Sequence, residues 1–306
     1  MKQTRVPGKN KRWICLQTNP AECMLFWKET KNSMRKLILG CGKAPETLKN
    51  VRRTGWDGVF FGYENAEILQ NAAAAATREN LIVHSVHAPF TGIWRLWEDE
   101  REGGAEELQT QIACIRAAAG IGVDLVILHA IIGMERSTPT LLGVERFGEI
   151  LRAAKKEGVR LALENTEGEP YLAALMQAYG DDPAVGFCID TGHELCYNHA
   201  QDMIGKYGKK KVFETHLNDN MGMTGEKPTW LDDAHMLPFD GIADWDGIAA
   251  RLKKADFCGD LVFELNQGNR PERHTNDRYI SLSQPEYFRL AHERAIRFAE
   301  LMSKAD

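Results

Sequence analysis

The sequence predicts an α/β fold made of a single (β/α)8 TIM barrel, and three observations indicate it. Eight short apolar runs rich in branched and aromatic residues recur along the chain, as buried parallel strands do. Segments with the helical period of apolar residues separate these runs. No shift in composition divides the chain, and its 306 residues fit one barrel of this class. The alternative is an open doubly wound sheet, but GCGKAP (40–45) lacks the third glycine of a dinucleotide-binding fingerprint.

The predicted strands follow one another at intervals that leave room for a helix each. The first four are KLILG (36–40), GVFFGY (58–63), LIVHSVHAP (81–89) and VDLVILHA (123–130). The last four are VRLALEN (159–165), AVGFCID (184–190), KVFETHLND (211–219) and LVFELN (261–266). Apolar stripes at helical spacing end at glycines between several of these runs: 108–119 before Gly120, 144–154 before Gly158, and 245–252 before Gly259. The order of elements is therefore that of strand–helix repeats.

Residues 1–34 fit no repeat of this pattern. We expect them to form an N-terminal extension, which is a disordered tail, an added terminal cap or an artefact of start-site choice, and residues 35–306 to form the catalytic barrel. Residues 1–35 contain eight Lys or Arg and two Asp or Glu, a net charge of +6, so the overall −5 leaves −11 for residues 36–306. An acidic barrel disfavours nucleic acid, whose phosphates need neutralising charge.

Cysteine usage and hydropathy predict the compartment. The seven cysteines are odd in number and form no CxxC pair, which is typical of reduced thiols in a cytoplasmic protein. No apolar run approaches the ~20 residues of a membrane-spanning helix. The N-terminal run ICLQTNPAECMLFW is interrupted by polar residues, so it does not make a signal peptide. We expect no membrane partner.

Four polar residues close the last four predicted strands: Glu164, Asp190, His216 and Glu264. The carboxyl ends of parallel barrel strands meet at one face, so these distant residues could converge on one point. Two glutamates, an aspartate and a histidine suit one divalent metal ion, Mn²⁺, Zn²⁺, Co²⁺ or Mg²⁺. Each residue alone could instead be a salt-bridged rim side chain, but their joint occurrence favours a metal-dependent enzyme.

Further imidazoles and a carboxylate fall near the same predicted face. His193 follows Asp190 by one helical turn, so both could face one cavity, although a capping role would explain it equally. His87 and His129 end the third and fourth strands. Asp233 and His235 form an i,i+2 pair in the loop after the seventh strand, which can reach a common ion.

The remaining candidates carry weaker patterns. Trp94 and Trp97 follow the third strand, where an aromatic ring could stack on a sugar, although helix packing is the alternative for one of them. Asp219 could orient the imidazole of His216. His84 is expected to be a packed, hydrogen-bonded side chain. Three cationic residues of the predicted upper loops could bind a phosphate or carboxylate: Arg136, Lys227 and Arg270. The alternative for each is a solvent-exposed surface charge without a functional role.

Several strings resemble the xylose isomerase-like barrel superfamily, which includes sugar (phosphate) isomerases and epimerases and the endonuclease IV type of abasic-site nuclease. They are HAP (87–89), LEN (163–165), DTGH (190–193), HLND (216–219), DAHMLPFDGIADW (233–245) and FEL (263–265). The resemblance spans residues 36–270 and implies that one divalent metal is bound by Glu164, Asp190, His216 and Glu264. It also implies that His193 contacts the substrate or a metal-bound group.

Two positions depart from the family pattern. Phe239 stands where the family loop usually has glycine, and Gly222 stands where ketohexose 3-epimerases have arginine. The second departure weakens an assignment to that substrate.

The expected function is a metal-dependent isomerase or epimerase acting on a sugar, sugar phosphate or polyol. Glu164 and Glu264 would transfer the proton through an enediolate. The substrate would be a small carbohydrate contacted by His193, Trp94, His87, His129, Asp233 and His235. Helix-rich residues 283–303 could join copies into a homo-oligomer.

Two other reactions stay open. The resemblance includes nucleases with a three-metal cluster, for which His87, His129, His193, Asp233 and His235 are candidate ligands. The acidic barrel weighs against a DNA substrate. An inosose-type dehydratase would use similar enediolate chemistry.

Overall fold

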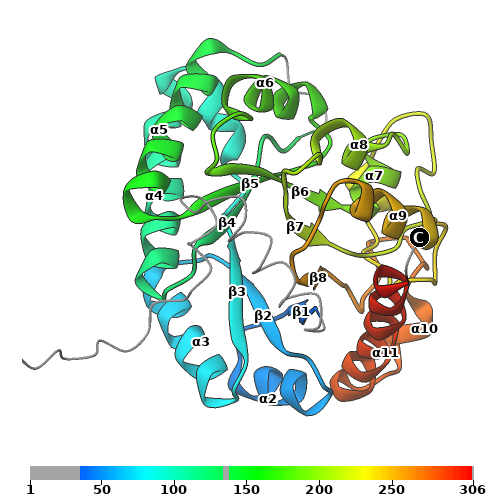
Figure 1. The fold of residues 1–306 in the computed structure, drawn as a ribbon. Helices are drawn as coiled ribbons and strands as arrows, with labels where there is room; N and C mark the ends of the chain where they lie inside the picture. Colours follow the sequence, from blue (N-terminus) through cyan, green and yellow to red (C-terminus); the bar gives the residue numbers. More distant parts are fainter. Residues whose placement is uncertain (1–34, 134–137, 305–306) are drawn as a thin grey trace, which may run out of the picture. The chain divides into compact units, whose positions relative to one another are not determined.

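Eight parallel strands lie in sequence order around one sheet in the computed structural model, which describes residues 35–133 and 138–304 (Figure 1). β1 pairs with both β2 and β8, and an isolated parallel bridge between Leu217 and Phe263 joins the β7 and β8 ends of the sheet. The sheet is therefore a nearly closed barrel, which confirms the predicted (β/α)8 fold. The strands are β1 (Leu37–Gly40), β2 (Gly58–Gly62), β3 (Ile82–His87), β4 (Leu125–His129), β5 (Arg160–Glu164), β6 (Val185–Asp190), β7 (Val212–His216) and β8 (Leu261–Phe263).

Helices surround the strands as an outer ring (Figure 1). The longer ones are α2 (Pro45–Arg53), α3 (Ala66–Arg78), α4 (Gly104–Gly120), α5 (Leu141–Glu157), α6 (Glu169–Tyr179), α9 (Trp245–Lys254) and α11 (Gln284–Ser303). The short ones are α7 (Thr191–Cys196), α8 (Met203–Tyr207), α10 (Asp277–Ile280) and the 3₁₀ turns η2 (Ile93–Trp97), η3 (Glu100–Glu102) and η4 (Trp230–Asp232). α11 closes the ring between α9 and α2.

Local sequence explains where the helices begin and end. Asn65 accepts a hydrogen bond from the backbone N–H of Ile68 and so caps α3. A capping box between Ser283 and Glu286 begins α11. α5 ends at Gly158, which adopts a left-handed φ of 72°, as the stop in its apolar stripe predicted.

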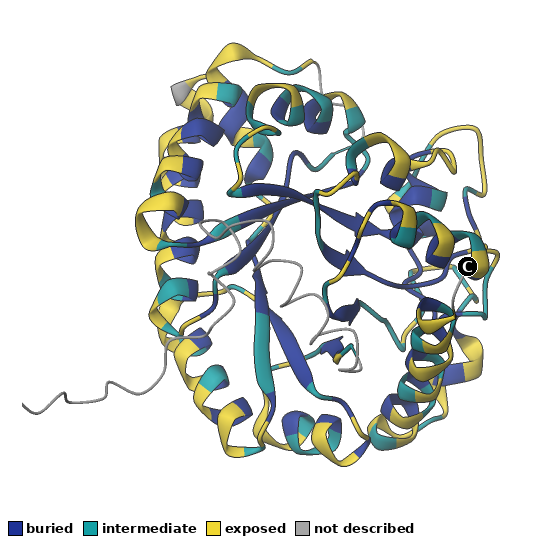
Figure 2. Ribbon diagram, viewed as in Figure 1, coloured by how far each residue is buried: buried dark blue, intermediate teal, exposed yellow. Residues whose placement is uncertain are grey.

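The core lies between the barrel and the inward faces of the helices, where burial is highest (Figure 2). Trp56, Phe61 and Phe263 are fully buried there. On α4 the predicted stripe of Leu108, Ile112 and Ile115 faces this layer. The apolar faces of the strands and of the surrounding helices thus bury each other, which is the main stabilising contribution in this fold.

A cluster of polar side chains around His84 lies inside the barrel, apart from the carboxyl ends of the strands. The side chain of His84 is 8% exposed; its Nδ1 lies 3.2 Å from Glu214 Oε2 and its Nε2 lies 3.7 Å from Asp260 Oδ2. Ser85 donates a hydrogen bond to Glu214. His84 is therefore packed as predicted.

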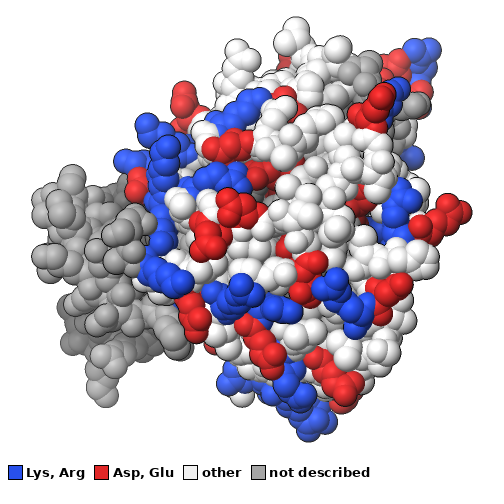
Figure 3. Space-filling model, turned by 90° about the vertical axis from the view of Figure 1, so that its right-hand side faces the viewer, with Lys and Arg blue, Asp and Glu red and all other residues white. Residues whose placement is uncertain are grey.

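Some expectations fall outside the described residues: the extension 1–34, whose boundary stays a prediction, and Arg136. Among the described residues, no helix is long and apolar enough to cross a bilayer. On the side of the barrel shown in Figure 3, acidic and basic side chains are interspersed over most of the surface.

Candidate metal centre

Four consecutive strands deliver the predicted metal ligands to one point. Glu164, Asp190 and His216 are the last residues of β5, β6 and β7, and Glu264 directly follows β8. One ligand atom from each of the four lies within 4.8 Å of the others. Glu164, Asp190 and His216 are fully buried, whereas the side chain of Glu264 is 30% exposed. Glu264 therefore faces the open side of the centre.

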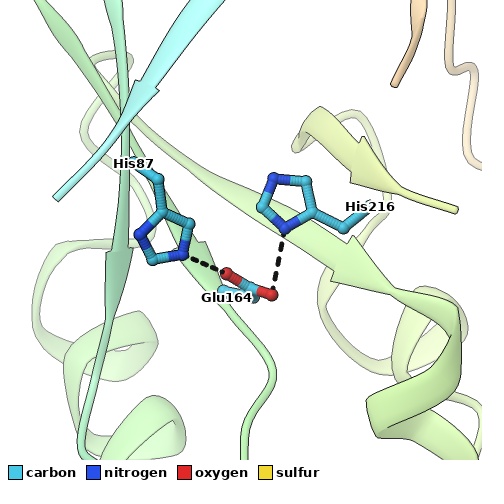
Figure 4. Close-up of side chains that lie close together, drawn as sticks. All are labelled: His87, Glu164 and His216. Carbon is cyan, nitrogen blue, oxygen red and sulfur yellow. Dashed lines mark hydrogen bonds and ion pairs between the residues drawn. The ribbon is translucent and has the colours of Figure 1, made fainter. Parts of the chain in front are cut away.

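The carboxylate of Glu164 lies at the middle of the cluster (Figure 4). Its Oε1 lies 3.1 Å from Nδ1 of His216, and that nitrogen also lies 3.1 Å from Oε2 of Glu264. Its Oε2 lies 3.2 Å from Nε2 of His87 and 3.3 Å from Nε2 of His129. One buried carboxylate thus contacts His216 with one oxygen and His87 and His129 with the other.

A second corner of the centre is built from α7 and the loop after β7. Oδ1 of Asp233 lies 2.9 Å from Nε2 of His235 and 3.5 Å from Nε2 of His193. Ligand atoms of Asp190, His193 and His235 also come within 4.8 Å of one another. Asp190 therefore borders both parts of the centre.

Main-chain carbonyls fix the tautomers of three histidines. Nδ1 lies 2.7, 2.9 and 3.1 Å from a backbone oxygen in His87, His193 and His235, and the acceptors belong to Ala88, Asn165 and Glu264. A carbonyl can only accept, so each Nδ1 carries a proton and each neutral ring has its lone pair on Nε2. Those Nε2 atoms face carboxylate oxygens, and two lone pairs repel unless a cation or a proton lies between them. The donor set and its tautomers thus fit a divalent metal.

The electrostatics agree with a site built for a cation. Burial raises the pKa of Asp190 to about 6. Burial also opposes ionisation of Glu264, but the adjacent His216 and His235 hold its pKa at about 2. Burial disfavours the imidazolium of His235, yet Asp233 raises its pKa to about 9. In the absence of a metal, protons on His193, His216 and His235 balance the buried carboxylates.

Asparagines next to the ligands hold Asp190 in place. The backbone N–H of Asp190 donates to Oδ1 of Asn165, and its Oδ2 accepts from Nδ2 of Asn218 at 2.8 Å. Its Oδ1 accepts from the backbone N–H of His193 at 2.7 Å, which caps α7. These asparagines were not predicted, although both lie within strings that carry candidate ligands, LEN (163–165) and HLND (216–219).

Asp219 does not orient His216, so that prediction is wrong. Its carboxylate accepts from Nε1 of Trp245 at 2.8 Å and from the backbone N–H of Ala243 at 3.0 Å. The loop after β7 folds back over Asp219, and an antiparallel bridge pairs Asp219 with Met236. The carboxylate therefore fastens this loop rather than the imidazole.

Phe239 occupies a glycine-like conformation in the same loop. Its φ is 71°, in the left-handed region that strains any residue with a Cβ. Its ring lies 5.2 Å from that of Trp245, and the guanidinium carbon of Arg297 lies 3.8 Å from the ring centre. The loop thus keeps the backbone that glycine would give, and packing of the ring against Trp245 of α9 and Arg297 of α11 offsets the strain.

An aromatic residue that sequence reasoning missed lies against the centre. Phe90 is 41% exposed, and its ring stacks on His129 with centroids 4.7 Å apart. The predicted Trp94 is half-buried and packs against the apolar core, with Arg95 over its ring. Trp97 is buried and donates to the carbonyl of Ala130. Phe90 directly follows HAP, and that position was the available indication.

Tyr197 is a second residue that the sequence did not indicate. It is 7% exposed, and its ring lies 4.9 Å from that of His193. Burial, with the charge of Asp233, raises its pKa, so the hydroxyl stays protonated and can donate.

Comparison with known proteins agrees with this architecture. The model of a family described as xylose isomerase-like TIM barrel matches residues 48–282. The uncharacterized protein y4fM of Sinorhizobium fredii (strain NBRC 101917 / NGR234) is 28% identical over 250 residues, which are 76% of this chain and 68% of that protein.

Solved structures share the fold. A D-psicose 3-epimerase crystallised in the presence of D-fructose superposes with a TM-score of 0.65 at 14% identity, covering 88% of this chain and 100% of that one. A xylose isomerase domain protein from Alicyclobacillus acidocaldarius superposes with a TM-score of 0.64 at 17% identity, covering 88% of this chain and 99% of that one. A xylose isomerase-like TIM barrel/4-hydroxyphenylpyruvate dioxygenase fusion protein superposes with a TM-score of 0.67 at 16% identity. The match covers 88% of this chain and 43% of the fusion protein.

Proposed function

Because the chain belongs to the xylose isomerase-like TIM barrel family, we propose that it is a divalent-metal-dependent sugar isomerase or epimerase. One observation carries this proposal. Glu164 and Glu264 approach the same atom, Nδ1 of His216, from two strands, each at 3.1 Å. Two carboxylates set around one point can remove a proton from a carbon and return it on the same or the other face.

The residues that would hold the metal are Glu164, Asp190, His216 and Glu264. When bound there, an ion such as Mn²⁺, Zn²⁺, Co²⁺ or Mg²⁺ would polarise a carbonyl oxygen of the sugar and so make the neighbouring C–H more acidic. The asparagines that fix Asp190 keep this donor set in place before the substrate arrives.

Proton transfer in this proposal belongs to the two glutamates. Glu264 is partly exposed, which suits a base that meets the substrate from the open side. Glu164 lies fully buried beneath it. They act either as a two-base pair or with one carboxylate shuttling the proton.

The hydroxyl groups and the ring of the sugar would be bound by side chains around the four candidate metal ligands. His87, His129, His193, Asp233 and His235 would contact substrate hydroxyls. Phe90 offers an exposed ring beside them, and the apolar face of a sugar stacks well on such a ring. Trp94 stays a predicted contact. Gly222 stands where ketohexose 3-epimerases have arginine, so we do not propose a ketohexose.

A second candidate is a metal-dependent phosphodiester hydrolase of the endonuclease IV type. The observation that favours it is that two further groups, one of His87, Glu164 and His216 and one of Asp190, His193 and His235, adjoin the main site. Clusters of metal ions suit phosphodiester hydrolysis. The charge of −11 on residues 36–306 weighs against a nucleic-acid substrate. An inosose-type dehydratase remains a third candidate.

The test combines metal analysis with two assays. Elemental analysis of protein purified without added metal gives the ions per chain. A screen of sugars, sugar phosphates and polyols by NMR in D₂O detects proton exchange, and an abasic-site oligonucleotide reports cleavage. One ion per chain with sugar proton exchange supports the proposal, whereas three ions with cleavage and no exchange refute it.

A further inference from the structure

Two arginines of the loop between β8 and α10 hold two consecutive aspartates of the loop after β7. Arg270 donates from Nη2 to Oδ2 of Asp233 at 2.8 Å and from Nε to the backbone oxygen of the same residue. Arg273 donates from Nη2 to Oδ1 of Asp232 at 3.0 Å and to Oγ1 of Thr224 at 3.1 Å. The two pairs have the same chemistry, but only Asp233 belongs to the candidate metal centre.

The two oxygens of Asp233 have different partners. Oδ2 accepts from Arg270, while Oδ1 faces Nε2 of His235 at 2.9 Å and Nε2 of His193 at 3.5 Å. Since Arg270 bonds both the backbone and the side chain of Asp233, it fixes the carboxylate plane as well as its position. Without the guanidinium, the short side chain of Asp233 could rotate and turn Oδ1 away from the imidazoles.

Arg270 is itself restrained. Its side chain is 28% exposed, and its guanidinium carbon lies 5.9 Å from the ring centre of Trp230. The loop that carries it is tied to the same segment by the hydrogen bond from the N–H of Asn266 to the oxygen of His235 and by that from Nδ2 of Asn276 to the oxygen of Ala234. The clamp therefore belongs to a rigid contact between two loops.

We propose that Arg270 is a positioning residue of the centre: it orients Asp233 so that Oδ1 completes, with His193 and His235, a ligand set for a divalent ion. Partners that orient metal ligands typically contribute 10- to 100-fold to metal affinity. The inference rests on the proposed metal dependence. It implies an ion additional to the one that Glu164, Asp190, His216 and Glu264 would hold, so that His193, Asp233 and His235 bind metal rather than substrate hydroxyls.

The competing explanation is that Arg270 only fastens the loop, as Arg273 does. The matched variants Arg270→Gln and Arg273→Gln separate the two, because each removes one arginine–aspartate clamp from the same loop. Metal-free forms of both are titrated with Co²⁺, followed by visible absorption and by calorimetry, and their thermal unfolding is recorded in parallel.

We expect both variants to lose thermal stability, but only Arg270→Gln to weaken Co²⁺ binding, by about tenfold or more. Arg270→Lys should restore part of the affinity, since an ammonium keeps the charge but cannot make the two-point contact. It also provides a folded variant if Arg270→Gln does not fold. In an Asp233→Asn background, Arg270→Gln should weaken Co²⁺ binding no further, because the two residues act in series.

Three results would overturn the inference: equal Co²⁺ affinities for Arg270→Gln and Arg273→Gln, additive losses in the double variant, or unchanged affinity in Asp233→Asn. Failure of the proposed function looks different. A chain that binds Co²⁺ normally but exchanges no sugar proton refutes the isomerase or epimerase, and the comparison of the two arginine variants still decides the role of Arg270.

Discussion

The imidazole of His129 lies nearly parallel to the ring of Phe90, with centroids 4.7 Å apart and 18° between the planes. The other edge of that imidazole reaches the centre, because its Nε2 lies 3.3 Å from Oε2 of Glu164. Burial lowers the pKa of His129, so the ring is neutral and stacks as an uncharged aromatic surface. An apolar wall thus begins one side chain away from the carboxylate that carries out the proposed chemistry.

Phe90→Ala should raise KM for the sugar roughly three- to tenfold and leave kcat nearly unchanged. Stacking on an exposed ring contributes about 0.5–1.5 kcal/mol of binding, which the alanine removes without touching the carboxylates. Steady-state kinetics measure it, with Phe90→Trp as the control that keeps an aromatic face. A fall in kcat with an unchanged KM would contradict a stacking role.

Glu264→Gln and Glu164→Gln should each slow proton exchange between the sugar and D₂O at least about 100-fold, because the amide is a far weaker base. NMR follows the exchange at saturating metal. Glu194→Gln is the matched control, since Glu194 is a buried glutamate paired with Arg251 at 2.7 Å outside the metal ligands. Near-normal exchange in both site variants with metal bound would refute their role as bases.

Metal-free protein should lose stability as pH rises from about 6.5 to about 9. The folded-state pKa of His235 is raised to about 9 by Asp233, so its contribution is present below the unfolded value of 6.5 and is lost as pH rises through 9. The pKa values of His193 and His216 are raised in the same direction by Asp190 and by the Cys188 and Glu164 side chains, against the effect of burial. His235 alone accounts for at most about 3 kcal/mol.

Chemical denaturation of the EDTA-treated protein across this range measures the loss. Saturating metal replaces the protons and should abolish the decline, so that metal affinity rises with pH instead. A stability that is flat or rises between pH 6.5 and 9 in the metal-free protein would show that these imidazoles do not carry the protons.

Phe239→Gly should be more stable than Phe239→Ala by about 1 kcal/mol. Both variants lose the contacts with Trp245 and Arg297, but only alanine keeps a Cβ at a φ of 71°. Thermal or denaturant unfolding of the pair isolates the backbone strain, because the lost packing is common to both. Equal stabilities would mean that the loop relaxes to another conformation when the ring is removed.

The barrel and the convergence of its four strand-end side chains could be predicted because they depend on regular geometry. Apolar runs give the strands, parallel strands end at one face, and Glu164, Asp190, His216 and Glu264 therefore meet. What sequence reasoning missed depends on how loops fold back. Asp219 follows His216 by three residues, yet its partner is Trp245, because the bridge to Met236 brings that segment over it.

Contacts between loops far apart in the sequence could not be predicted either. Arg270 and Asp233 are 37 residues apart in two loops without a repeating pattern, so no periodicity relates them. Phe90 could be recognised as an aromatic after a strand, but whether it or Trp94 is exposed depends on how η2 packs against the neighbouring helices.

The hydrogen bonds from Nδ1 of His87, His193 and His235 to main-chain carbonyls have a consequence for redesign. Backbone atoms, not neighbouring side chains, fix which ring nitrogen faces the carboxylates, so that choice survives substitution of the residues around it. The orientation of these three imidazoles can therefore be treated as fixed. Engineering of substrate preference can concentrate on Phe90 and Trp230, whose exposed rings take no part in those hydrogen bonds, and can leave the three histidines unchanged.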